Sequence, residues 1–537
     1  MTERHVAADT SNGAARPVAH PALVLLIIAG AQLMVVLDAT IVNIALPSMG
    51  DYFHKSQTDM TWVLNAYTLA FGGLLLLGGR AGDILGRRRM FIVGLALFTI
   101  GSFAGGIANS FGLLLAGRVV QGVGGAIASP TALSLITVSF AEGRERNRAI
   151  GVYGAVSGAG AALGLLLGGI LTEYLDWRWV LFVNVPIGVV LIAGAFLYLH
   201  EGERLKGKFD FVGAVVSVAG MVTLVYAFIH VANTQDWTSP STILLFTGAV
   251  VLLATFVLLE AFVIGDPIMP MRIFQNRSRS GAYLVMLIAG AGLFGMFFLL
   301  TFFVQQVMHF SALKTGLAFV PVAIVIGIVS QIAAQLLPKI GPKAIITTGT
   351  VLLTGGLLWL STVTADSTYW GKIFPGMMVL GIGMGFIFVP LTTVAVSKVR
   401  DTDAGLASAL LNVGQQVGGS IGLSVLATVA ATAARNATAN KVAELAAQVK
   451  AGQLPNTVLD HYGQVAAAQQ GVKASPAALH DNVAVNAVAE VQAHAASMGF
   501  VAATVFAAVA VVVSLVFINV KKTELPTPEA ALAGADA

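Results

Sequence analysis

The chain has 537 residues, of which 57% are hydrophobic and only 10% are charged, and its formal net charge is +4. Because a soluble domain carries about 25% charged residues, this composition excludes an ordinary soluble protein and indicates an all-α membrane protein with many spans. The small net charge indicates no nucleic-acid partner, and the absence of cysteine excludes disulfides and thiol chemistry.

Fourteen apolar runs are long enough to cross about 30 Å of hydrocarbon. The polar segment 1–21 has no apolar core of the kind that signal peptides carry, so the first run is expected to remain as a span. The predicted spans are 22–47, 61–79, 90–108, 112–137, 149–172, 179–199, 210–231, 242–263, 281–306, 316–337, 344–363, 373–396, 405–432 and 498–519.

The distribution of lysine and arginine predicts the orientation of these spans. If the N-terminus lies in the cytoplasm, most basic residues of the short loops fall on the cytoplasmic side, as the positive-inside rule requires. An even number of spans then places both tails, 1–21 and 523–537, in the cytoplasm. The segment 433–497 is the one long loop and is expected to be extracellular and partly helical. We expect a monomer in the plasma membrane, surrounded by the lipid bilayer.

The first span carries Asp38 near its middle. A charged Asp at that depth costs roughly 2.5–3.5 kcal/mol, so the side chain needs a function or a partner. One interpretation is a proton acceptor that also acts as counter-ion for a cationic substrate. The alternative is a structural acid that pairs with another helix and fixes the packing.

The loop between spans 2 and 3 is dense in charge. Its Asp83, Arg87 and Arg88 are predicted to form a gate on the cytoplasmic side. Asp401 and Asp403, which precede span 13, are the expected partners of these arginines. The alternative is that the arginines only set the orientation in the membrane.

The same loop has a fainter copy after span 10. When Gly86 is aligned with Gly341, span 2 corresponds to span 10, which indicates two homologous six-helix halves around a central cavity. We therefore expect the halves at 22–200 and 265–522, with two inserted helices in 201–264.

Span 4 contains Arg118, the one basic residue well inside a span. It must face the bundle or a water-filled cavity, and Gln121 shares its helical face at i+3. A function in proton coupling and a structural role as hydrogen-bond donor to backbone carbonyls are both open at this point.

Small residues form a stripe along span 5 and let neighbouring helices approach closely. We interpret the stripe either as a sliding contact between the two halves or as ordinary tight packing. The residues predicted to take part in gating there are Gly154, Gly158, Gly164 and Gly168.

Three residues near span ends or in span 6 receive simpler interpretations. Glu173 and Glu260 lie at span ends, where a charge costs little, so no special role is expected for them. Asn184 begins the sequence Asn-Val-Pro, which is expected to kink span 6.

Aromatic rings with a few amides and one acid suit large, apolar, often cationic molecules. A single aromatic ring in a span more often packs against protein or lipid than against a ligand, so the amides are the stronger signal. The predicted substrate-binding residues are Met34, Asp38, Trp62, Asn65, Gln121, Phe294, Phe298, Gln305, Gln331, Asn412 and Gln415.

Four motifs, in order along the chain, resemble those of the major facilitator superfamily and in particular its fourteen-helix drug:proton antiporter branch. They are the loop Gly79–Arg89, the segment Leu37–Pro47 in span 1, the segment Arg118–Gly125 in span 4 and the glycines of span 5. The resemblance covers nearly the whole chain. One position departs from it, because Leu165 stands where the antiporter motif has a proline that would kink the helix.

The resemblance implies a proton-coupled secondary exporter of apolar, often cationic drugs, in which Asp38 and Arg118 serve proton coupling. Arg118 is then expected to adjust the proton affinity of a nearby carboxylate. The alternatives are an exporter of a lipid or an endogenous natural product with weak proton coupling, and a membrane sensor that does not transport. Because the sequence has no Walker motif and no His/Cys cluster, we expect no enzyme activity, no metal and no cofactor besides the proton as coupling ion.

Overall fold

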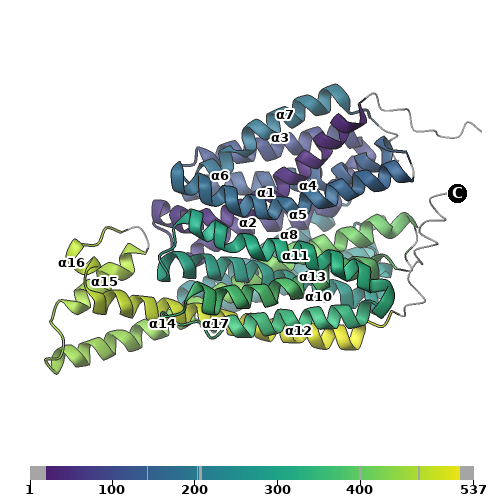
Figure 1. The fold of residues 1–537 in the computed structure, drawn as a ribbon. Helices are drawn as coiled ribbons and strands as arrows, with labels where there is room; N and C mark the ends of the chain where they lie inside the picture. The colour runs from purple at the N-terminus through teal and green to yellow at the C-terminus, as the bar shows by residue number, and fades with distance from the viewer. Residues whose placement is uncertain are drawn as a thin grey trace, which may run out of the picture.

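The computed structural model describes residues 20–520, except for 142, 202, 203, 205–208, 266, 398, 400, 470 and 471. Within that part of the chain every regular element is a helix (Figure 1). By length and composition, 14 helical stretches are able to cross a membrane, in agreement with the fourteen predicted spans. The predicted tails lie almost entirely outside the described residues.

The first group of helices precedes residue 200. Its sixth span is broken at Val183 into two helices, next to the kink predicted at Asn184. The group consists of α1 (Pro21–Phe53), α2 (Gln57–Leu85), α3 (Arg87–Gly106), α4 (Phe111–Ser139), α5 (Arg144–Tyr174), α6 (Trp179–Phe182) and α7 (Asn184–Tyr198).

Two further groups follow. The inserted pair consists of α8 (Phe211–Thr234) and α9 (Pro240–Leu258), which continues as η1 (Leu259–Val263). The last group consists of η2 (Met271–Gln275), α10 (Arg277–Phe302), η3 (Phe303–Val307), α11 (Ala312–Ile340), α12 (Pro342–Leu360), η4 (Tyr369–Ile373), α13 (Phe374–Val396), α14 (Asp401–Lys450), α15 (Val458–Ala468), α16 (Pro476–Leu479) and α17 (Asn482–Phe517).

The first and last groups repeat the same local design. In the first, α3 and α2 both pack on α4, and in the last, α12 and α11 both pack on α13. The joint between the paired helices is a glycine in each case: Gly86 links α2 to α3 with φ 110°, and Gly341 links α11 to α12 with φ 83°. Such positive φ values favour glycine because they strain residues that carry a Cβ. The alignment of these two glycines in sequence therefore matches their equivalent places in the fold.

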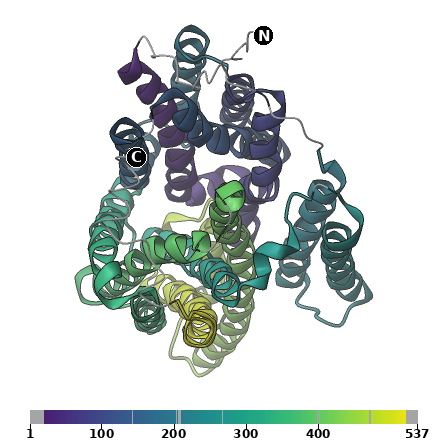
Figure 2. The same cartoon turned by 90° about the vertical axis from the view of Figure 1, so that its right-hand side faces the viewer.

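The inserted pair lies at the flank of the molecule. Figure 2 shows α1–α7 on one side, α10–α17 on the other and α8 with α9 beside them. α8 contacts both α2 and α14, so it covers one seam between the two large groups. The exact domain limits given above stay predictions.

The long loop is more helical than expected. α14 runs without a break from Asp401 to Lys450, and α17 begins at Asn482, so both extend past the bundle with α15 and α16 between them (Figure 1). The Ala-rich sequence favours helix, which explains why the helices do not stop at the predicted span ends. We call residues 433–497 the excursion. The end of the bundle that carries it is the excursion end, and the end where α1 begins and α17 finishes is the tail end.

Candidate functional site

A cluster of buried polar side chains lies inside the first group of helices. Asp38 comes from α1, Ser102 from α3, Arg118 and Gln121 from α4, and Asn184 from the first position of α7. All five are 0% exposed. We call these five residues the Asp38 cluster.

Three donors compensate the carboxylate of Asp38. Arg118 Nη1 donates to Oδ2 at 2.6 Å, while Gln121 Nε2 and Asn184 Nδ2 donate to Oδ1 at 2.9 and 3.0 Å. Gln121 is held in place because its amide also donates to the Ser102 hydroxyl and accepts from Arg118 Nη1 at 3.0 Å. The carboxylate is thus bonded to two other helices, α4 and α7, within its own group.

Arg118 connects three helices. Its Nε donates to the carbonyl oxygen of Val63 on α2 at 3.1 Å, and its guanidinium lies 4.5 Å from the centroid of the Tyr67 ring. Its Nη2 is buried and has no acceptor among the described residues. Arg118 therefore fixes α1, α2 and α4 together and keeps one donor for a further partner.

The Asp38–Arg118 pair can respond chemically to a proton. Removing one charge of a buried ion pair typically costs about 3–5 kcal/mol, because the remaining charge is left uncompensated. A proton on Asp38 would leave the Arg118 cation in that position. The cost of this uncompensated cation favours a different arrangement of the helices that hold the pair.

Asp38, Gln121 and Met34, which were predicted to bind substrate, are enclosed by protein in this conformation. All three side chains are 0% exposed, and Met34 belongs to the apolar core of the first group. Of the two interpretations of Asp38, the pairing with another helix is the one that the structure contains. Its role in proton coupling stays a prediction.

The two large groups are joined near the excursion end. Asn65 on α2 donates to the hydroxyl of Ser424 on α14 at 2.9 Å. Gln305 on η3 donates to the carbonyl oxygen of Ile44 on α1 at 3.0 Å. Both amides were expected to bind substrate, and here they instead hold the halves together.

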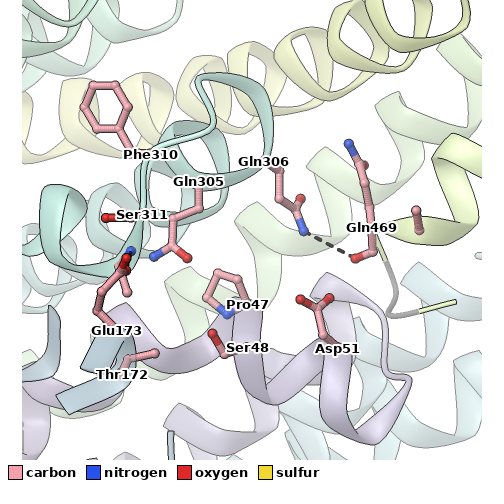
Figure 3. A pocket seen from close by; sticks show the side chains of 12 residues that line it. Pro47, Ser48, Asp51, Thr172, Glu173, Gln305, Gln306, Phe310, Ser311 and Gln469 are labelled. Carbon is pink, nitrogen blue, oxygen red and sulfur yellow. Dashed lines mark hydrogen bonds between the residues drawn. The ribbon is translucent and has the colours of Figure 1, made fainter. Parts of the chain in front are cut away.

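A cavity of about 380 Å³ lies at the same junction (Figure 3). On one side Glu173 of α5 accepts the backbone N–H of Ala312, the first residue of α11, at 3.0 Å. A carboxylate at a helix N-terminus is stabilised by the helix dipole. On the other side Gln306 donates to the carbonyl oxygen of Gln469 in the excursion at 3.5 Å. The excursion therefore forms part of the wall of this cavity.

The backbones of the two halves come close together where α5 meets α11. A Cβ at Gly316 of α11 would collide with the carbonyl oxygen of Leu165, and a Cβ at Gly169 would lie 2.8 Å from the Cα of Leu313. Backbones this near each other require glycine at the contact. Leu165 itself, at the position where the motif has proline, belongs to this contact.

The same two helices separate toward the tail end. Gly154 lies eleven residues before Leu165, and Gly327 lies eleven residues after Gly316, so each is about three turns farther along the same helical face. A Cβ at Gly154, at Gly158 or at Gly327 would meet nothing within 4 Å. The faces that touch at the excursion end are thus apart near the tail end.

The prediction of one sliding stripe along α5 needs correction. Gly164 and Gly168 pack against α1 in their own group, since Cβ atoms there would meet Thr40 and Ile41. A Cβ at Gly154 or Gly158 would meet no atom of the other half within 4 Å. The contact between the halves runs through Leu165, which belongs to the predicted stripe, and through Gly169 and Gly316.

The charged loop between α2 and α3 has different partners from those expected. Arg87 pairs with Asp83 one turn earlier at 3.0 Å, and the guanidinium of Arg88 donates to the carbonyl oxygen of Phe196 at 2.8 Å. Glu201, which the sequence analysis did not consider, accepts the backbone N–H of Arg88 at 3.1 Å. These contacts stay within the first group and the residues that directly follow it.

The expected partner Asp403 is engaged elsewhere. It pairs with Arg272 of η2 at 3.1 Å, and the side chain of Asp401 lies outside the described part of the chain. The predicted pairing of Asp403 with the arginines of the charged loop is therefore wrong for this conformation, because a nearer arginine of its own half occupies it.

The other predicted substrate residues are dispersed over the bundle. Trp62 faces the inserted pair, with its ring 6.2 Å from that of Tyr226 on α8. Phe298 is fully buried against Phe302. Phe294 and Gln415 are half-buried, and Gln331 and Asn412 are exposed. In this conformation the structure brings together Asp38, Arg118 and Gln121 but does not gather the remaining residues around one cavity.

Ser102, Asn184 and Glu173 were not among the site residues predicted from the sequence. Ser102 and Asn184 are polar side chains within apolar runs, and that position alone marks them as needing a partner. Glu173 carried no such signal, because a carboxylate at a span end is cheap and its partner is a backbone amide of another helix.

A family model described as Major Facilitator Superfamily matches residues 28–423. The chain belongs to the major facilitator superfamily. This membership confirms the resemblance of the motifs and identifies a multi-pass membrane transporter.

Two relatives illustrate the family. The puromycin resistance protein pur8 of Streptomyces alboniger is 42% identical over 397 residues, which are 73% of this chain and 78% of that protein. The cephamycin export protein CmcT of Amycolatopsis lactamdurans is 38% identical over 420 residues, which are 78% of this chain and 86% of that protein.

A solved structure supports the fold. The crystal structure of a bacterial homolog to the human lysosomal transporter Spinster, in an inward-facing and occupied conformation, superimposes with a TM-score of 0.65. The match covers 94% of this chain and 98% of the other at 15% identity. The predicted major facilitator fold is therefore confirmed.

Proposed function

We propose that this chain is a proton-coupled exporter of small amphiphilic molecules, drugs and antibiotics among them, across the plasma membrane. The observation that carries the proposal is the ion pair of Asp38 and Arg118, 0% exposed and 2.6 Å apart in the centre of the first group. A buried ion pair adds little to the stability of a fold, because the desolvation of both charges offsets their attraction. Its presence therefore favours a role in function. The names of the relatives, puromycin resistance and cephamycin export, support the direction and the cargo.

We place the tail end in the cytoplasm and assign this conformation to the inward-facing part of the transport cycle. The positive-inside rule supports the orientation. The contact of Leu165 with Gly316, together with the separation at Gly154 and Gly327, supports the assignment of the state. A single chain is the proposed working unit.

The coupling proceeds through the first group of helices. In the inward-facing state Asp38 is ionised and compensated by Arg118. In the outward-facing state Asp38 takes up a proton from outside, Arg118 turns to another acceptor, and the affinity for the cargo falls. Because linkage is reciprocal, binding of cargo from the cytoplasm then favours release of the proton there. Asp38 acts on the cargo through helix positions, since it has no exposed surface in this conformation.

The cargo surface is proposed on the last group of helices. Asn412 and Gln331 are exposed, and Phe294 and Gln415 are half-buried. Amides beside aromatic rings fix the orientation of an apolar molecule without a strong charge requirement. Trp62 is left out of this surface because it faces α8.

The proposal is tested in everted membrane vesicles from cells that lack their own pumps. The variant Asp38→Asn keeps the size of the side chain and cannot exchange a proton. We expect proton-driven accumulation of a cationic dye in these vesicles to be lost, with the amount of protein in the membrane unchanged. Asp176→Asn is the matched control, because Asp176 forms a partly exposed pair with Arg178. Full dye transport by Asp38→Asn would reject the role of this carboxyl.

A second cargo is favoured by two of the relatives. CmcT and the tetracenomycin C resistance and export protein of Streptomyces glaucescens are named for export of single compounds, and the latter is 33% identical over 396 residues. Export of an endogenous natural product would then be the physiological task. Proteoliposomes given such a compound, with and without a pH gradient, distinguish strong from weak proton coupling.

A further inference from the structure

Two acidic side chains of the inserted pair are buried at its tail end. Asp210 directly precedes α8, and Glu260 lies in η1, at the end of α9. Their exposed fractions are 5% and 3%. Glu260 stands at a span end, where no special role was expected, yet the folded chain removes it from solvent.

Each carboxyl group has one satisfied and one unsatisfied oxygen. Asp210 Oδ1 accepts the backbone N–H of Gly213 at 2.7 Å, and Glu260 Oε2 accepts the backbone N–H of Met269 at 2.8 Å. Asp210 Oδ2 and Glu260 Oε1 are buried and have no hydrogen-bond donor among the described residues. A buried polar atom without a partner is costly and calls for an explanation.

The two unsatisfied oxygens meet at one point. A Cβ at Gly213 would lie 2.6 Å from Glu260 Oε1 and would collide with Asp210 Oδ2. Because Gly213 has no side chain, the volume that a Cβ would fill is left to the two carboxyl groups. The two oxygens that lack donors therefore lie close together beside Gly213.

No cation compensates the two acids within the described part of the chain. α8 and α9 with η1 carry no other charged side chain, apart from His230 at the opposite end of α8. On the helices packed against α8, Asp83 is paired with Arg87 and Asp403 with Arg272.

Of the other charged residues on these helices, Asp59 lies near His230 at the opposite end of α8, and those of α14 from Arg435 onward lie in the excursion. At the tail end of α2 the remaining charged residue is Arg80. It stands two turns from Gly73, whose position contacts Val218 of α8, and it forms no ion pair with either acid. Two ionised carboxylates facing each other in an apolar site repel strongly, and such sites keep one proton between them.

We propose that Asp210 and Glu260 share one proton and form a carboxyl–carboxylate pair, a proton-binding site separate from Asp38. The proton supplies the donor that each orphan oxygen lacks. Asp210 holds the first turn of α8 and Glu260 holds the segment at Met269 that leads into the last group. The shared proton thus links the residue before α8 to η1, which are the first and last parts of the inserted pair.

Infrared spectroscopy of the purified full-length protein in lipid nanodiscs tests the site. At neutral pH the wild type is expected to show the C=O stretch of one protonated carboxyl that disappears in Glu260→Gln and also in Asp210→Asn. In each variant the new amide N–H donates to the remaining carboxylate, so no proton is needed. Asp38→Asn is the matched control and is expected to keep the band. A band that survives both Glu260→Gln and Asp210→Asn would overturn the proposal.

Two further measurements guard against variants that fail to fold. Gly213→Ala places a methyl group between the oxygens and is expected to remove the band, whereas Gly248→Ala, where a Cβ meets nothing within 4 Å, is expected to keep it. The spectrum is also recorded with sodium, potassium or choline as the buffer cation. A spectrum that changes with the cation, and lacks the carboxyl band in choline, would show a metal-ion site and refute the shared proton.

Discussion

Arg118 is the residue whose geometry is hardest to replace. Its Nη1 pairs with Asp38, its Nε reaches the carbonyl oxygen of Val63, and its planar group lies over Tyr67. A flat guanidinium with several fixed donors can make these contacts together, whereas an ammonium is a single point charge. The shape of the side chain, beyond its charge, therefore positions Asp38 against α2 and α4.

Arg118→Lys tests the importance of this shape. Lysine can keep a charge near Asp38 but loses the simultaneous bond to Val63, so we expect dye transport to fall roughly tenfold, equivalent to about 1.4 kcal/mol. The measurement is the initial rate in everted vesicles, normalised to protein in the membrane. Arg178→Lys is the control, since Arg178 is partly exposed. Equal rates for Arg118→Lys and the wild type would show that the charge alone suffices.

Gly86 adopts the positive φ that the joint between α2 and α3 requires. Its φ of 110° costs an L-residue roughly 1–2 kcal/mol, and a Cβ there would lie 2.7 Å from the Glu201 carboxyl group. Gly86→Ala is therefore expected to lower the free energy of unfolding by about that amount. Thermal unfolding in detergent measures the loss. Gly112→Ala, where a Cβ meets nothing within 4 Å, is expected to be nearly neutral and serves as reference.

At the scale of elements, the excursion has its own small core. Leu445 of α14, Val458 and Tyr462 of α15, and Ala484 and Val488 of α17 are buried together. This core explains why α14 and α17 stay helical beyond the bundle. It also fixes the position of α15, whose C-terminal end leads to Gln469 in the wall of the cavity between the halves.

The pKa of Asp481 predicts how the stability of the excursion changes at low pH. Burial alone would raise the pKa of Asp481, but the His461 side chain and the backbone N–H groups of Ala484 and Val483 outweigh it and lower the pKa below the ordinary value. A lowered pKa stabilises the folded state above the unfolded pKa of about 3.9, and this contribution is lost as the pH falls through the folded pKa.

Hydrogen exchange of α15 between about pH 5 and about pH 3 is the measurement, and exchange corrected for intrinsic rates is expected to rise as the pH falls. Asparagine also caps helices well, so Asp481→Asn should keep α17 but remove this pH dependence. Asp460→Asn, at an exposed bond to Gln464, should retain it. A pH dependence that persists in Asp481→Asn would assign the effect to another group.

At the scale of the whole molecule, the sequence predicted what lies in local patterns. Hydrophobic runs indicated the spans, and the similar short motifs around Gly86 and Gly341 indicated the repeat. Each run and each motif consists of residues that are close in sequence. The partners of Asp38 were out of reach, since Asn184 lies far along the chain and meets it only after packing. The gate pairing failed for the same reason: Arg272 competes for Asp403, and only the folded chain shows which arginine is nearer.

The two halves are predicted to close at the tail end during transport, and one cysteine pair reports this movement. Gly154 and Gly327 both lie about 16 Å from the contact of Leu165 with Gly316, at 1.5 Å per residue. The chain has no cysteine, so the pair Gly154→Cys and Gly327→Cys is unambiguous. A disulfide needs Cα atoms within about 7 Å, so it is expected to form only in the outward-facing state.

A substitution at the excursion end tests whether the two ends of the bundle move together. Gly316→Ala forces a methyl group onto the carbonyl oxygen of Leu165, which disfavours the seal at the excursion end. If the halves rock as rigid bodies, this substitution should accelerate disulfide formation between Cys at 154 and 327. The matched control is Gly355→Ala, where a Cβ meets nothing within 4 Å, and it should leave the rate unchanged. Cross-linking of the tail-end pair at one unchanged rate, with or without Gly316→Ala, would contradict coupled movement of the two ends and would require α5 to bend between Leu165 and Gly154.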